Sequence, residues 1–256
     1  MPQNKEENHL EKQEFFSIAE RVFRENGLSE FWNDATKDKF YSLCGIMLEQ
    51  NKVMNLSAIR DEEGVICRHF ADSLTVAKHI PEGAKVLDVG SGGGMPTLPL
   101  AIARPDVTVK ALDATAKKMA YVLSAAEKLG LANVSTISAR AEELGNTPEH
   151  REKYDVVCAR AVAELRILAE WCVPFAKKGG LFIAMKGKNG GKELADAKNA
   201  AKTLLLRLEK DDEFNLFDPS AKEEADAKRH IFVFTKTAAT PKQYPRRNAQ
   251  IQKKPL

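Results

Sequence analysis

The sequence predicts an α/β fold, in which a mostly parallel twisted sheet carries helices on both faces and follows an N-terminal helical extension. Two observations support it. From about residue 85 onward, short apolar or alternating segments that suit strands alternate with longer segments of helical periodicity. A glycine-rich stretch, residues 90–94, follows the first of these strand segments and precedes a helix. Such alternation is typical of βαβ units and a parallel sheet.

The first 80 residues are helical in pattern. Apolar side chains recur at helical spacing in residues 10–25 and 36–50, and a third apolar, helix-like stretch, 65–79, ends before Pro81. We therefore expect an N-terminal helical extension over residues 1–80 and an α/β domain over residues 81–236. Residues 237–256, rich in Pro, Lys and Arg, are expected to form a basic C-terminal tail without regular structure.

Within the α/β domain each element has its own signal. The first strand is an apolar run stopped by glycines, the second alternates, the helix after it is closed by Gly130, and the fifth strand is apolar throughout. The expected strands are residues 85–89, 107–112, 133–137, 154–158, 181–185 and 230–235. The expected helices between them are residues 97–103, 117–129, 162–176 and 195–208.

Charge is unevenly distributed along the chain. The net charge is only +3, but no Asp or Glu follows Lys236, whereas the first 35 residues are rich in Glu. This asymmetry indicates that one basic end faces a polyanion, although a merely solvated tail is an open alternative. The cations of the tail are Lys242, Arg246, Arg247, Lys253 and Lys254.

The cysteines and histidines give no sign of a metal site. The four cysteines form no Cys-x-x-Cys pair, and the five histidines are scattered. The N-terminus lacks the apolar core of a signal peptide, and no apolar run approaches the roughly 18 residues that span a bilayer. We expect a monomeric cytoplasmic protein with reduced thiols, no metal and no membrane contact.

The spacing of the glycines suggests which ligand the loop binds. A dinucleotide fingerprint would require glycine at position 95, which is Met95. The pattern present, Asp-x-Gly-x-Gly-x-Gly over residues 88–94, resembles motif I of Rossmann-like class I methyltransferases, which bind S-adenosylmethionine. Asp113, at the end of the second strand, suits hydrogen bonds from ribose hydroxyls, with Ala114 and Thr115 beside it.

Other positions bear on the acceptor. Methyl transfer from a sulfonium is an in-line displacement, so the enzyme mainly orients the acceptor. The fourth strand ends in Cys158-Ala159-Arg160, without the Asn/Asp-Pro-Pro-Tyr/Phe loop of adenine-amine methylation or the Pro-Cys pattern of pyrimidine C5 methylation. Guanine N7 carries a free lone pair and no proton, and therefore needs no general base. Arg160 and Lys186, at the ends of the fourth and fifth strands, are cations suited to guanine's acceptor edge or to a phosphate.

Several motifs in order resemble the bacterial small-subunit ribosomal RNA guanine-N7 methyltransferase family (RsmG, or glucose-inhibited division protein B). The resemblance covers nearly the whole chain beyond the first few dozen residues. The matching segments are residues 55–59, 68–74, 88–96, 98–100, 160–163, 185–187, 229–230, 244–247 and 255–256. Departures are Thr97, where the family usually has glycine, and residues 248–251, where glycine and proline often follow the paired arginines.

The resemblance implies that the substrate is a guanine in the 530 loop of 16S ribosomal RNA, or in the small subunit that contains it. It makes Arg160 a functional residue of the pocket, and Lys186 is a second candidate catalytic residue because of its position at the end of the fifth strand. It assigns the cofactor, S-adenosylmethionine, to Gly90, Met95, Asp113, Ala114, Thr115, Ala141, Glu142 and Arg160. RNA contact is expected through Arg246, Arg247, Lys253, Lys254 and Lys186.

Three alternatives stay open at this stage. From its position alone, Glu142 is as well explained as the start of a surface helix. The chain as a whole is also compatible with a methyltransferase for a small molecule or protein side chain. It is finally compatible with an RNA-binding assembly factor that has lost its cofactor, although the intact glycine loop and Asp113 argue against such a loss.

Overall fold

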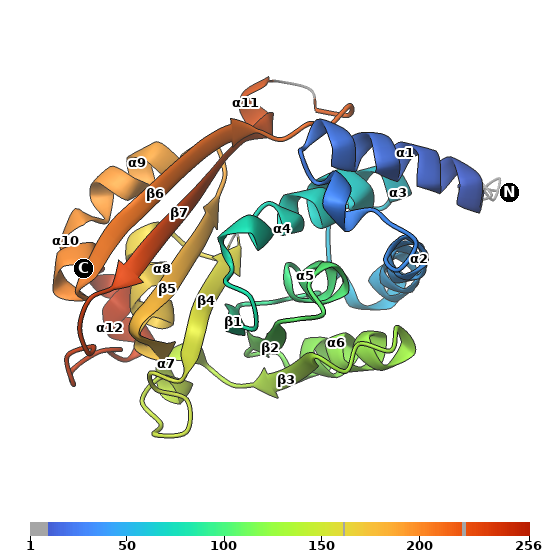
Figure 1. Ribbon diagram of the computed structural model, residues 1–256. Helices are drawn as coiled ribbons and strands as arrows, with labels where there is room; N and C mark the ends of the chain where they lie inside the picture. The colour runs from blue at the N-terminus through green and yellow to red at the C-terminus, as the bar shows by residue number, and fades with distance from the viewer. Residues whose placement is uncertain (1–9, 161, 222–223) are drawn as a thin grey trace, which may run out of the picture.

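The computed structural model describes residues 10–160, 162–221 and 224–256 (Figure 1). Residues 1–9, the start of the expected N-terminal extension, and Ala161, within the matching segment 160–163, lie outside the described residues. In the described part a seven-stranded sheet has the order β3-β2-β1-β4-β5-β7-β6. The first five strands are parallel, and β7 pairs antiparallel with β5 and β6. The mostly parallel sheet predicted from the sequence is confirmed.

The strands are β1 (Lys85–Val89), β2 (Thr108–Asp113), β3 (Val134–Ser138), β4 (Tyr154–Arg160), β5 (Ala176–Lys186), β6 (Leu206–Asn215) and β7 (Lys228–Lys236). The longer helices are α1 (Lys12–Glu25), α2 (Lys37–Met54), α5 (Thr97–Ala103), α6 (Ala116–Lys128), α8 (Leu165–Cys172), α9 (Gly190–Asp196), α10 (Lys198–Thr203) and α12 (Asn248–Lys253). Short helical turns are η1 (Ser29–Phe31), α3 (Glu62–Gly64), η2 (Val65–Ala71), α4 (Asp72–Leu74), η3 (Ala77–His79), α7 (Ala141–Leu144), η4 (Val173–Phe175) and α11 (Glu224–Ala227).

Helices cover both faces of the sheet (Figure 1). The N-terminal helices, α5 and α6 pack on one face, and α8, α9 and α10 pack on the other. One cluster of buried side chains joins Phe15 and Phe23 of α1 and Phe40 of α2 to Val86 of β1 and Val109 of β2. The N-terminal helices therefore share a hydrophobic core with the sheet, which fixes their position beside it.

Two expectations about secondary structure were wrong. Residues 206–208, assigned to a helix, begin strand β6, which the sequence analysis did not foresee. Chain direction changes at Leu205, whose φ is +60°. The basic tail, expected to lack regular structure, contains α12 and contacts α8. Ile251 of α12 is fully buried, so packing against the domain explains why this tail is ordered.

Candidate active site

The glycine loop leaves the carboxyl end of β1. Gly90, Gly92 and Gly94 have φ values of +75°, +55° and +85°, which favour glycine strongly. At Gly90 there is also no space for a side chain, because a Cβ there would lie 2.6 Å from a methyl carbon of Val162. The loop is tied to the next strand: Asp113 Oδ2 accepts from the backbone N–H of Gly92 at 3.1 Å. Its Oδ1 accepts from the N–H of Thr115 at 2.8 Å.

A pocket of about 320 Å³ opens between this loop and the ends of β2 and β3. It brings together most of the residues expected at the cofactor, namely Gly90, Asp113, Ala114, Thr115, Ala141 and Glu142. Met95 and Arg160 do not line it; Met95 is buried, with its Sδ 3.9 Å from Ser73 Oγ. Sequence reasoning missed several further lining residues, among them Lys118, Arg140, Val162, Trp171 and Asn248.

The base of the loop is held by Asp88, a fully buried carboxylate. Its Oδ2 accepts from Thr97 Oγ1 at 2.7 Å, and Thr97 Oγ1 lies 2.9 Å from Ser91 Oγ. Burial raises the pKa of Asp88 to about 6, although the hydrogen bonds from Thr97 and Ser91 oppose the shift. Thr97, which departs from the family pattern, therefore links the first strand to the helix after the loop.

Arg160, at the end of β4, is held by the N-terminal region. Its Nη1 donates to the carbonyl of Arg68 and to Asp72 Oδ2, each at 2.9 Å, and its Nη2 lies 3.2 Å from His69 Nδ1. Burial, assisted by the charges of Arg160 and Arg68, lowers the pKa of His69 to about 3. His69 is therefore neutral near pH 7, with Nδ1 accepting from Arg160. Its Nε2–H then donates to Ser57 Oγ at 2.7 Å.

A smaller hollow of about 180 Å³ is lined by Arg160. Arg229 of β7 contributes its Nε, which donates to Asp72 Oδ1 at 2.9 Å, so one carboxylate bridges two arginines. Lys186 of β5 also lines this hollow but is almost fully buried, with Nζ 2.6 Å from Glu193 Oε2. Because the charge of Lys186 is paired, the cationic character of the hollow comes from the two arginines.

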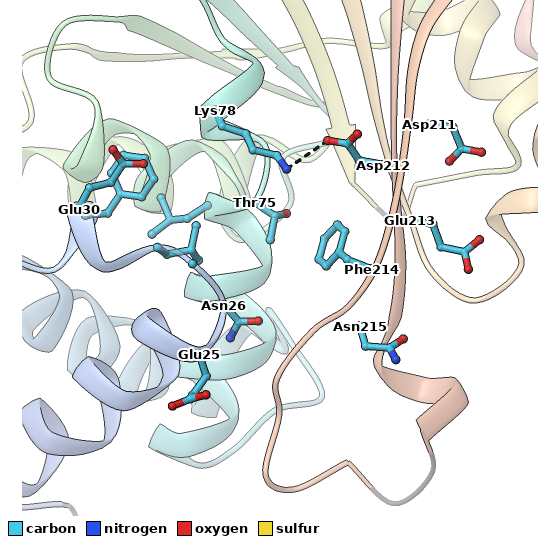
Figure 2. A pocket seen from close by; sticks show the side chains of 14 residues that line it. Glu25, Asn26, Glu30, Thr75, Lys78, Asp211, Asp212, Glu213, Phe214 and Asn215 are labelled. Atoms are coloured by element: carbon cyan, nitrogen blue, oxygen red, sulfur yellow. Dashed lines mark ion pairs between the residues drawn. The ribbon is translucent and has the colours of Figure 1, made fainter.

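A third hollow, about 630 Å³, lies between the N-terminal region and strand β6 (Figure 2). Its described lining includes five carboxylates and one lysine, Lys78, whose Nζ is 3.1 Å from Asp212, and Figure 2 shows this ion pair. The carboxylates are Glu25, Glu30, Asp211, Asp212 and Glu213. Their charge is of the wrong sign for a polyanion, so this hollow does not suit RNA.

The tail is attached by a buried ion pair. Glu170 of α8 is fully buried, and its carboxylate accepts from Arg246 Nη2 at 2.6 Å and from Arg246 Nε and N at 2.8 Å each. Arg151 donates to the tail carbonyls of Thr240 and Tyr244. Arg246 is thus a structural residue, not the free RNA-facing cation we expected. Of the other expected RNA contacts, Arg247, Lys253 and Lys254 are exposed, whereas Lys186 is buried and paired with Glu193.

The cysteines, which we expected to be reduced, form no disulfide. All four are free and buried, and burial raises the pKa of Cys158 well above its usual value, so it is not a nucleophile. Among the described residues no cluster of His, Cys, Asp or Glu has the arrangement of a metal site. None of their helices is long and apolar enough to cross a membrane.

Comparison with known proteins identifies the family. The sequence profile of the family described as rRNA small subunit methyltransferase G matches residues 36–216. The chain belongs to this family. The ribosomal RNA small subunit methyltransferase G of Acetivibrio thermocellus is 41% identical over 88% of this chain and 90% of its own length. That of Pelotomaculum thermopropionicum is 45% identical over 86% and 89%. The predicted methyltransferase family is confirmed.

Solved structures support the fold. A SAM-dependent methyltransferase from Aquifex aeolicus superposes with a TM-score of 0.50 at 18% identity, covering 70% of this chain and 96% of its own. One from Methanosarcina mazei gives 0.50 at 13% identity, covering 63% and 96%. The Rossmann-like methyltransferase fold predicted from the glycine loop is therefore confirmed.

Proposed function

We propose that this protein transfers the methyl group of S-adenosylmethionine to N7 of a guanine in the 530 loop of 16S ribosomal RNA. The proposal rests mainly on the two hollows that residues at and just after the end of β4 line. One is lined by Val162 and the other by Arg160. The first suits a nucleoside that carries no phosphate, and the second is cationic.

In the first hollow, Asp113 holds the ribose of the cofactor. Its carboxylate is at the end of β2 and is already aligned by the N–H groups of Gly92 and Thr115. Ala141 and Glu142 border the adenine, and Gly90 allows close approach of the methionine part to the backbone. The described lining has only two cations, the half-buried Lys118 and the exposed Arg140, and so offers no cluster of basic side chains for a pyrophosphate.

In the second hollow, Arg160 and Arg229 hold the acceptor. Asp72 supplies one negative charge for two guanidinium groups, so the cluster keeps a net positive charge that complements guanine O6 or a phosphate. Neutral His69 fixes Arg160 in place. Guanine N7 attacks the methyl carbon as the carbon–sulfur bond breaks, and the electron pair stays on sulfur. No proton moves, so orientation is the main contribution of the protein.

Exposed cations of the tail supplement this contact. Arg247, Lys253 and Lys254 lie on the same C-terminal segment as Asn248, which lines the cofactor hollow. They are placed to bind the RNA backbone while a splayed-out guanine enters the acceptor hollow. Lys186 supports the acceptor hollow through its pair with Glu193. The reaction takes place in the cytoplasm, where ribosomal subunits are assembled.

The test is transfer of labelled methyl from S-adenosylmethionine to small ribosomal subunits from cells lacking this protein, followed by nucleoside analysis. We expect 7-methylguanosine at one site, and no label with Asp113→Ala as the matched control. Label in another nucleoside would retain methyl transfer and refute the acceptor. No label on subunits or free RNA, with methyl transfer to a small molecule or protein, would refute the RNA substrate.

A further inference from the structure

We infer that Asn248 in the C-terminal segment and Trp171 on α8 together recognise the adenine base of the methyl donor. The inference rests on the proposed function of the cofactor hollow and adds two residues to it. Both side chains line this hollow, although neither belongs to the glycine loop nor to the ends of β2 and β3.

The two side chains share an unusual property. The indole Nε1 of Trp171 and the carboxamide Oδ1 of Asn248 are both shielded from solvent, and neither has a hydrogen-bond partner in the described part of the chain. A buried polar group without a partner is costly, and nearly all such groups in native proteins are satisfied. Because both atoms belong to residues that line the same hollow, we take a ligand bound there as the group that supplies the missing acceptor and donor.

Adenine has the matching groups. Its 6-amino group is a donor, and the ring nitrogens on either side of it, N1 and N7, are acceptors. We assign the 6-amino group to Asn248 Oδ1 and a neighbouring ring nitrogen to Trp171 Nε1–H. The ribose is already assigned to Asp113, which also lines the hollow, at the end of β2. An acceptor for the 6-amino group would make the site selective for adenine over 6-oxopurines.

A single ion pair holds both residues in place. Glu170 precedes Trp171 directly, and Arg246 lies two residues before Asn248. Because the Glu170 carboxylate accepts three hydrogen bonds of 2.6–2.8 Å from Arg246, the tail and α8 are fastened together beside the hollow. Polar groups that are already held in position lose little conformational entropy when a ligand binds. The tail therefore contributes to cofactor binding as well as to the charge of the surface.

The experiment measures binding of S-adenosylhomocysteine and of its analogue lacking the 6-amino group to the full-length protein by isothermal titration calorimetry. We expect the wild type to bind the analogue roughly 5- to 10-fold more weakly, the effect of one net hydrogen bond. Asn248→Ala should bind S-adenosylhomocysteine more weakly by a similar factor and should bind the two ligands with equal affinity. Gln250→Ala, an exposed position on the same helix, is the matched control and should retain the wild-type preference.

A second readout separates recognition from a structural role. Since Asn248 Oδ1 has no partner, ligand-free Asn248→Ala should unfold at the wild-type temperature or above it. A lower unfolding temperature together with unchanged ligand preference would overturn the inference. So would equal affinity of the wild type for both ligands. A wild type that binds neither S-adenosylmethionine nor S-adenosylhomocysteine would instead refute the proposed function, and the inference with it.

Discussion

Replacing Arg246 with alanine should be among the most destabilising changes outside the hydrophobic core. Its partner Glu170 is fully buried, and Arg246 supplies both side-chain donors and a backbone donor to that carboxylate. Removing one member of a buried ion pair leaves an uncompensated charge and typically costs about 3–5 kcal/mol. That is a large part of the roughly 5–15 kcal/mol by which domains are stable. We therefore expect Arg246→Ala to lower the free energy of unfolding by about 3–5 kcal/mol.

The assay is urea unfolding, with the double variant Arg246→Met/Glu170→Leu as the internal comparison. The double variant removes both charges but leaves the backbone N–H of residue 246 without its acceptor, so it should lose only about 1–3 kcal/mol. Arg247→Ala, at an exposed neighbouring position, should stay within about 0.5 kcal/mol of the wild type. A single variant as stable as Arg247→Ala, or a double variant less stable than the single, would refute this reasoning.

Three further outcomes are expected. Because Arg160 loses its anionic partner, Asp72→Asn should lower the turnover number about tenfold or more with little change in the KM for S-adenosylmethionine. In the same methyl-transfer assay the control Asp226→Asn, at an exposed position, should match the wild type. The buried Asp88 carboxyl has its pKa raised to about 6, so the folded state keeps a proton that the unfolded chain releases near pH 4. Between about pH 4 and pH 6 the free energy of unfolding of the wild type should therefore fall by about 3 kcal/mol relative to that of Asp88→Asn. Parallel curves of this free energy against pH for the two proteins would contradict the raised pKa. Alanine at all three exposed tail cations should lower the slope of log binding constant against log salt concentration for RNA by the equivalent of two to three phosphate contacts, and should leave cofactor affinity unchanged. An unchanged slope would exclude the tail from the RNA contact. Those cations are Arg247, Lys253 and Lys254.

The parallel part of the sheet was predictable because its strands are either apolar, as in β1, or alternate in polarity, as in β2, and helical segments separate them. Strand β6 was not predictable, since its five central residues, Glu209 to Glu213, are all charged and it lies at the edge of the sheet. An edge strand exposes most of its side chains and needs no apolar face, and charges there hinder pairing with other chains. Its conformation comes from pairing with β7, a long-range interaction that local periodicity does not record.

The cofactor hollow was predictable where motif and strand end coincide, as at Gly90 and Asp113. Trp171 and Asn248 were not predictable, because they reach the hollow through packing of α8 and the tail. Charge alone was also a poor guide to which cations are free. Lys186, Arg246 and Lys254 all carry a positive charge. Lys186 Nζ, however, lies 2.6 Å from Glu193 of the next helix, and Arg246 Nη2 lies 2.6 Å from Glu170, which is distant in the sequence. Only the fold distinguishes a paired cation from an exposed one.

The N-terminal helices are part of the acceptor site rather than an appendage to it. Asp72 and His69 of this region contact Arg160 of β4, and Asp72 also contacts Arg229 of β7, so three parts of the chain meet at one carboxylate. Without Asp72 the two guanidinium groups would repel each other, and without α1 and α2 the apolar side chains of η2 and α5 that pack against them would be exposed. The same residues thus close the core and set the charge of the acceptor hollow, so a protein beginning at residue 81 should neither fold stably nor bind its acceptor.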